Sequence, residues 1–220
     1  MSAITRSSTA AGQNALLACG AIAGPLLIVV GFAQIPLRAG FDWTRHPLSM
    51  LTLGEAGWVQ VANFIVSGSL FVLAAVGIRG ALKGSPAGTW GPILMAGIGV
   101  GLVMGGIFTA DPGFGFPPGA PAGPPAGMSW HAGLHLAGFL IGFVSLAAAS
   151  IVFGRRYWKM GQRSWAVYSV ASGVVVAASF PITISGLSGG NLLPLWVALV
   201  VGWLWASSVP ARLLKVGANV

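Results

Sequence analysis

Six long apolar stretches, separated by shorter polar connections, run the length of the chain. A helix needs about 20 mostly apolar residues to cross a bilayer, and each stretch is long enough to do so. The pattern therefore predicts an all-α integral membrane bundle that forms a single domain over residues 1–220. The expected spans cover residues 14–37, 57–82, 91–110, 130–153, 164–187 and 192–213.

The composition supports a membrane protein and excludes a soluble one. Of the 220 residues, 55% are hydrophobic and only 6% are charged, whereas soluble domains carry about 25% charged residues. The 34 glycines agree with closely packed transmembrane helices. The formal net charge of +8 comes from basic residues that flank the apolar stretches. It therefore indicates membrane orientation and not binding to nucleic acid.

The basic residues also predict which side of the membrane holds the termini. An even number of spans places both termini on one side, and all Lys and Arg residues except Arg38 and Arg45 fall on that side. Since positive charge concentrates in cytoplasmic loops, both termini are predicted to be cytoplasmic. Tryptophans near the span ends fit the aromatic belts of a membrane protein. Those expected at the outer ends are Trp43, Trp58, Trp130 and Trp196.

This topology gathers the acids and histidines on the outer side. They are Asp42, Glu55, Asp111, His46, His131 and His135. The two connections that hold them, 38–56 and 111–129, are long for a compact domain. Because long loops often carry function, any site is predicted to face outward.

Two histidines at the start of the fourth span suggest a metal site. His131 and His135 are four residues apart and share one helix face, a spacing used in helical zinc sites. The positive end of the helix dipole keeps them neutral, which is the form that binds metal. His46 could supply a third nitrogen. The alternative is two interfacial histidines, one solvated and one bonded to a loop carbonyl.

Asp111 and Ser49 are the candidate catalytic residues beside this metal site. Asp111 is expected to end the third span, where the helix dipole disfavours a carboxylate by about 0.3–1 kcal/mol. It could be a metal ligand or orient a ligating histidine, or it could cap its own turn. Ser49 could bond a developing oxyanion at a metal-activated carbonyl. A Ser-His-Asp triad is a weaker option, because no Gly-x-Ser-x-Gly elbow surrounds Ser49. A plain loop, anchored by Arg45 and Trp43, explains the segment equally well.

Two sequence blocks carry a family resemblance. The first runs from His46-Pro47-Leu48-Ser49 through Gly57-Trp58 and Asn63-Phe64 to Gly68. The second runs from Phe108-Thr109-Ala110-Asp111-Pro112 through Phe116-Pro117-Pro118 to His131 and His135. In this order and spacing they resemble the prokaryotic six-span membrane family called domain of unknown function 998. The resemblance implies a multi-pass protein of a prokaryotic plasma membrane and supplies no activity.

A second resemblance concerns the chemistry of the site. Alkaline ceramidases and adiponectin-receptor-like proteins are seven-span membrane hydrolases, and their zinc site uses a Ser, an Asp and three His. This chain is similar in residue types and order through His46, Ser49, Asp111, His131 and His135. It differs in having six spans and in placing His-x-x-x-His at the start of the fourth. The similarity implies zinc as a cofactor.

These observations lead to two main hypotheses. The first is a metal-dependent hydrolase, embedded in the membrane, that acts on a lipid or amphiphile entering from the outer leaflet. The second is a small-molecule or lipid binder, or a subunit of a membrane complex, with an apolar outer pocket in which the histidines do not converge. Transport is less favoured, because the spans carry no charge at mid-membrane. Polar residues such as Gln60 and Asn63 are expected to hydrogen-bond between helices. Membrane lipids are the expected partners, and the pattern is compatible with an oligomer.

Overall fold

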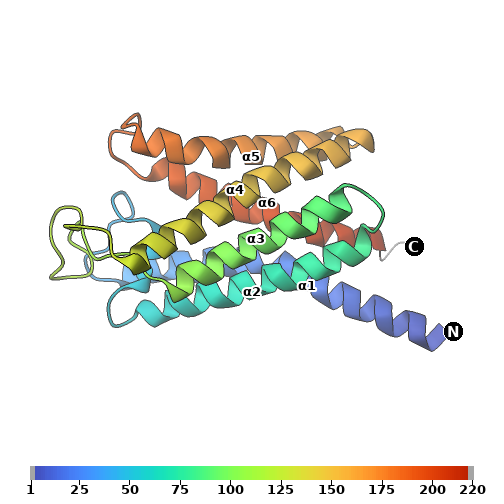
Figure 1. The fold of residues 1–220 in the computed structure, drawn as a ribbon, viewed down its shortest axis with the longest axis horizontal. Helices are drawn as coiled ribbons and strands as arrows, with labels where there is room; N and C mark the ends of the chain where they lie inside the picture. The colour runs from blue at the N-terminus through green and yellow to red at the C-terminus, as the bar shows by residue number, and fades with distance from the viewer. Residues whose placement is uncertain (1–2, 218–220) are drawn as a thin grey trace.

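The computed structural model describes residues 3–217 (Figure 1), so the ends of the predicted domain, residues 1–2 and 218–220, lie outside the described residues. Over residues 3–217 the chain is all-helical. The long helices are α1 (Ala3–Gln34), α2 (Gly57–Ala81), α3 (Ala87–Ile107), α4 (Trp130–Lys159), α5 (Arg163–Ile184) and α6 (Leu193–Gly217), and the short 3-10 helices are η1 (Ile35–Leu37) and η2 (Leu48–Thr52). Each long helix has a stretch long and apolar enough to cross a membrane, which confirms the predicted six-span bundle.

The helices pack in chain order into a closed ring. Each helix contacts the next, and α6 returns to α1. The N-terminal end of α1 and the C-terminal end of α6 lie at the same end of the bundle, and the long connections lie at the other (Figure 1). We call these the terminal end and the loop end. The assignment of the terminal end to the cytoplasm remains a prediction from the distribution of positive charge.

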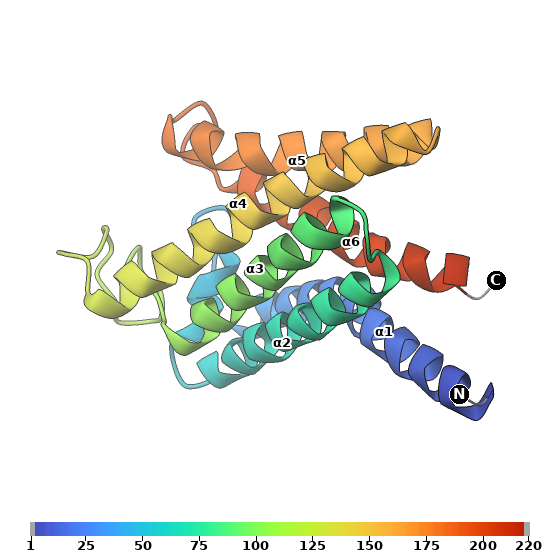
Figure 2. The same cartoon turned by 45° about the vertical axis from the view of Figure 1, so that its right-hand side comes forward.

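Small residues allow α3 and α4 to approach closely. A Cβ built on Gly101 of α3 would lie 2.5 Å from the Gly138 carbonyl oxygen and 2.7 Å from the Gly142 backbone nitrogen of α4. The two backbones are therefore in contact at this crossing, as in other transmembrane helix pairs built on small residues. Figure 2 shows α3 and α4 running side by side along this contact.

Buried amides link α1 to α2. Gln34 Nε2 donates to Gln60 Oε1 at 2.7 Å, and Asn63 Nδ2 donates to the Leu27 carbonyl oxygen at 3.1 Å. This agrees with the predicted role of Gln60 and Asn63 in hydrogen bonding between helices.

Two predictions from the sequence are corrected at the loop end. Helix α3 ends at Ile107 and not at residue 110, because Phe108 turns to an extended conformation while its N–H still caps the Met104 carbonyl. Asp111 thus lies four residues beyond the helix and does not face its dipole. Trp196 does not join the aromatic belt: it is only 5% exposed, it packs against Phe32, and its Nε1 donates to the Trp43 carbonyl oxygen at 2.6 Å.

Candidate functional site

The segment 38–56 folds back into the bundle between α1 and α2. Its 3-10 helix η2 buries Leu48 and Leu51 against the core, so the segment is re-entrant and does not lie flat on the surface. Arg38 holds it in place, since its guanidinium donates to the carbonyl oxygens of Leu51, at 2.8 Å, and Leu53. Buried irregular backbone needs such donors, because its carbonyls have no helical partners.

His46 connects the two long loops. Its Nδ1 accepts a hydrogen bond from the Asp42 backbone N–H at 2.9 Å, so its Nε2 carries the proton and donates to the Phe114 carbonyl oxygen at 3.0 Å. The ring packs against Phe41 and Phe116, with both ring centroids at 5.4 Å, and these two rings also contact each other at 5.3 Å. His46 is 2% exposed. With both ring nitrogens in use, the imidazole is neutral and acts as a latch between segments 41–46 and 114–116.

Asp42 and Glu55 lie in the same segment but take no part in the latch through their carboxylates. The Asp42 carboxylate accepts hydrogen bonds from the hydroxyl and the backbone N–H of Thr44, at 2.6 and 2.9 Å. These bonds favour the ionised form and hold the pKa of Asp42 below its usual value. Glu55 is exposed.

His131 and His135 lie on α4 but have different surroundings. His135 Nδ1 lies 2.8 Å from the carbonyl oxygen of Phe108. Because α3 ends at Ile107, this carbonyl has no hydrogen-bond donor within the helix. His131 stacks on Trp130, with ring centroids 3.7 Å apart. The sequence left open one histidine solvated and one bonded to a loop carbonyl. His135 lies on a loop carbonyl, whereas His131 is half-buried against Trp130 and Phe108.

Asp111 closes the proline-rich loop onto the start of α4. Its Oδ2 accepts from the Ser129 backbone N–H at 2.8 Å, and Ser129 in turn caps α4, its Oγ accepting from the Ala132 N–H. Hydrogen bonding from Ser129 lowers the pKa of Asp111. Asp111 is therefore bonded to the far end of its own loop, and does not cap its Asp-Pro-Gly turn.

The predicted metal ligands are not brought together. Among residues 3–217, no group of three or more His, Cys, Asp or Glu side chains is placed so that it could hold a metal ion. His46, His135 and Asp111 each bond to a different part of the loop backbone. The structure tests neither the presence of zinc nor a catalytic role for Asp111, and both stay predictions.

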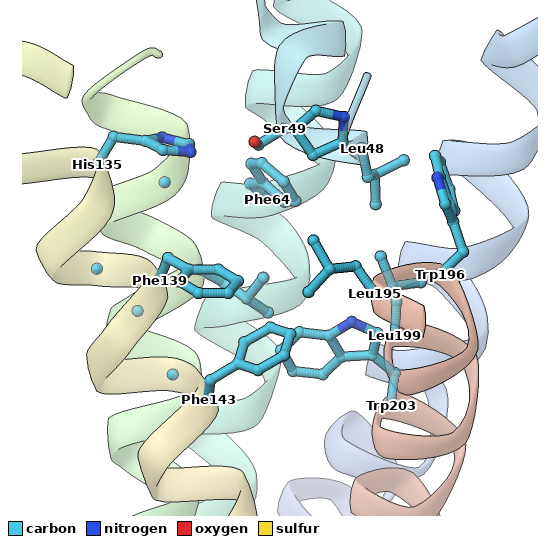
Figure 3. Close-up of a pocket in the computed structure, with 16 residues that line it drawn as sticks. Leu48, Ser49, Phe64, His135, Phe139, Phe143, Leu195, Trp196, Leu199 and Trp203 are labelled. Carbon is cyan, nitrogen blue, oxygen red and sulfur yellow. The ribbon is translucent and has the colours of Figure 1, made fainter. Parts of the chain in front are cut away.

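The structure brings Ser49 and His135 together at an apolar cavity near the loop end. The cavity has a volume of about 120 Å³ and lies between α4 and α6 (Figure 3). Its walls are almost wholly apolar. They are formed mainly by Leu48, Phe64, Leu102, Phe139, Phe143, Leu195, Trp196, Leu199 and Trp203.

Ser49 and His135 form the polar end of this cavity. Figure 3 shows the imidazole projecting from α4 toward the Ser49 hydroxyl, with Phe139 and Phe143 following on the same face of α4. Because a carbonyl oxygen only accepts, the Phe108 carbonyl holds the proton of His135 on Nδ1. In the neutral ring, His135 Nε2 is then free to accept a hydrogen bond. The polar end of the cavity therefore offers a ligand one acceptor, His135 Nε2, and one hydroxyl, that of Ser49.

Most apolar residues of the cavity wall were not predicted from the sequence, although a signal was present. His135, Phe139 and Phe143 follow at intervals of four, and so do Leu195, Leu199 and Trp203, which places each trio on one helix face. Such stripes normally indicate ordinary core packing. Only the meeting of α4 and α6 across a gap makes them the walls of a cavity.

Comparison with known proteins identifies a family but no characterised relative. Residues 21–211 match the family described as "Protein of unknown function (DUF998)". No curated protein and no solved structure matches the chain. The similarity to alkaline ceramidases therefore rests on residue types alone.

Proposed function

We propose a ligand-binding function for this multi-pass membrane protein, which belongs to the DUF998 family of unknown function. The ligand is an amphiphile with an uncharged polar head, bound with its apolar chain in the cavity between α4 and α6. The observation that carries the proposal is one apolar cavity that ends in a single hydroxyl and a single imidazole, Ser49 and His135.

The size of the cavity limits what it can hold. A cavity of roughly 150 Å³ holds one benzene molecule, so a volume of about 120 Å³ suits a short stretch of one hydrocarbon chain. A chain that comes from the bilayer gains little from the transfer, because lipid tails are as apolar as the cavity wall. The polar head must therefore decide which amphiphile binds.

The polar groups define the head that fits. His135 Nε2 can accept from a ligand hydroxyl, while Ser49 Oγ can donate to an ester or amide carbonyl. Neither group carries a charge when His135 is neutral, and a buried charge without a partner is costly. An uncharged head with a hydroxyl next to an ester, as in a monoacylglycerol, matches both groups.

Photocrosslinking tests the proposal directly. The probe is a monoacylglycerol with a diazirine in its acyl chain, added to the purified protein in detergent, and the labelled peptides are mapped by mass spectrometry. We expect labelling of α4 and α6 beside the cavity. Leu199→Trp fills the cavity and should abolish this labelling, whereas Leu204→Trp on the same helix, at a position 45% exposed, should not. Equal labelling of wild type and Leu199→Trp would refute the proposal.

Hydrolysis of the bound amphiphile is the second candidate, since Ser49 and His135 share one cavity. His135 Nε2 would act as the base that takes the proton of the Ser49 hydroxyl. The Phe108 carbonyl would orient the imidazole, which is the role of the aspartate in a Ser-His-Asp triad. Release of fatty acid from monoacylglycerol tests this step separately from binding. A turnover that Ser49→Ala abolishes, while crosslinking persists, would establish hydrolysis. Crosslinking without turnover leaves binding as the function.

A further inference from the structure

A second and larger depression lies at the terminal end of the bundle, between α4 and α5. It has a volume of about 570 Å³, and we call it the α4–α5 groove. Gly154 on α4 and small or β-branched residues on α5 form its apolar floor; the α5 members are Ala166, Val167, Val170 and Ala171. Val167 and Val170 are 61% and 45% exposed, so this floor faces the surroundings of the bundle and not its core.

Basic side chains form the rim of the α4–α5 groove. Arg155 and Lys159 both line it, because residues four apart share a helix face. Trp158, between them, also lines it, and the Arg163 guanidinium lies 3.6 Å from the centroid of the Trp158 ring. Stacking uses the flat face of a guanidinium and leaves its N–H groups in the ring plane to bind an anion.

Within residues 3–217, the charges of the rim have no acidic side chain as a partner at their own end of the molecule. Four cations occur within residues 155–163, and the only three acids of the chain are Asp42, Glu55 and Asp111. All three acids lie in the loops at the loop end, opposite the α4–α5 connection (Figure 1). No acidic side chain of the described residues balances the charge of this groove, which favours an anionic partner from outside the chain.

We propose that the α4–α5 groove binds one anionic phospholipid. The phosphate sits at the rim against Arg155, Lys159 and the stacked Arg163, and an acyl chain lies along the apolar floor. Basic pockets between transmembrane helices bind acidic head groups in this way, and an exposed tryptophan at the same level, such as Trp158, is typical of the interface. A zwitterionic lipid fits less well because its ammonium group faces the basic rim. This site is separate from the cavity near Ser49 and does not depend on it.

Native mass spectrometry of the intact protein tests the proposal. The protein is titrated in detergent with palmitoyl-oleoyl phosphatidylglycerol or with the corresponding phosphatidylcholine. We expect one phosphatidylglycerol to bind more tightly than phosphatidylcholine. Arg155→Gln with Lys159→Gln should weaken that binding roughly 10- to 30-fold, given the usual contribution of each basic residue to anionic-lipid binding.

A matched variant controls for net charge. Lys83 and Lys215 are exposed and lie at the terminal end away from the groove, so Lys83→Gln with Lys215→Gln removes the same charge and should leave the tight site intact. Ala171→Trp fills the groove without changing any charge and should also abolish tight binding. Gel filtration and circular dichroism verify that each variant is folded.

Three results would overturn the proposal. Equal affinity for the two lipids would remove the role of the basic rim. An equal loss in both double variants would show a general charge effect and not a site. Displacement of phosphatidylglycerol by millimolar inorganic phosphate would show that the rim binds free anions without needing the acyl chain.

Discussion

Replacing His46 by alanine should release the latch between the two long loops. The substitution removes the acceptor of the Asp42 N–H and the donor to the Phe114 carbonyl oxygen. It also removes the imidazole that packs against the rings of Phe41 and Phe116. The bundle itself does not depend on these contacts, so we expect local opening of the loop end with the six helices retained.

The size of the effect follows from the contacts that are lost. Asp42 is half-buried and Phe114 is 40% exposed, so water can reach both orphaned groups and each lost bond costs about 1 kcal/mol. Each aromatic pair adds about 0.5–1.5 kcal/mol beyond area burial. The opening free energy should therefore fall by about 3–5 kcal/mol, which raises the equilibrium constant for opening by roughly 10²- to 4 × 10³-fold.

Hydrogen exchange followed by mass spectrometry measures this opening. Peptides that cover residues 41–53 and 108–118 should exchange faster in His46→Ala, while peptides from α2 and α3 serve as the internal reference. His46→Phe keeps the ring packing but loses both bonds, so it should show only about 2 kcal/mol of the effect. His131→Ala is the matched control, because His131 stacks on Trp130 away from the latch.

Two results would refute this reasoning. Exchange in His46→Ala that is no faster than in His131→Ala would show that the latch does not hold the loops together. Faster exchange of the wild type after treatment with a chelator would show that a metal ion holds them. The second result would return His46 to the role that the sequence suggested.

Three further predictions concern helix packing, pH and metal. Gly101→Ala should destabilise the protein by about 1–3 kcal/mol in thermal unfolding, because its Cβ meets the backbone of α4; Gly133→Ala, with its nearest neighbour at 3.9 Å, should be neutral or stabilising. Since the pKa of Asp111 is lowered in the folded state by Ser129, protection of the start of α4 should be complete above the ordinary carboxyl pKa of about 3.9 and be lost as the pH falls through the lowered folded value. In Asp111→Asn this pH dependence should disappear. Metal analysis should find the same metal content in wild type and His135→Ala; a stoichiometric zinc that this variant loses would support the zinc hypothesis and contradict the binding geometry described above.

The sequence was sufficient for the helices because their formation in a membrane depends on few conditions. A stretch of about 20 apolar residues without charge has no alternative to a helix in a bilayer. The exact ends were harder, because they depend on tertiary contacts. Helix α3 stops at Ile107, and the Phe108 carbonyl freed beyond it accepts from His135, 27 residues further along the chain.

The candidate site could be predicted from the sequence only in part, again because it depends on tertiary contacts. Ser49 and His135 were recognised from residue type, but the cavity that joins them depends on α6, which the motifs did not include. The i, i+4 spacing of His131 and His135 predicted a shared role, but the two rings contact different groups. His135 is bonded to the Phe108 carbonyl, and His131 packs against Trp130. Spacing along a helix fixes the face, but the chain packed against that face decides the chemistry.

The gathering of ionisable groups at the loop end has a physical cause that does not involve a metal. Inside the spans most carbonyls are bonded within their own helix, whereas the loop segments 38–56 and 108–129 leave many carbonyls without helical partners. The side chains that donate to them are Arg38, to Leu51 and Leu53, His46, to Phe114, and His135, to Phe108. Side chains that donate hydrogen bonds, such as arginine and histidine, are needed where loop carbonyls have no helical partner. The histidines that resemble metal ligands in the sequence are therefore also residues that hold the loops in place. Of these, only His135 also lines the apolar cavity, and for that reason it is the residue through which loop structure and ligand binding are expected to be coupled.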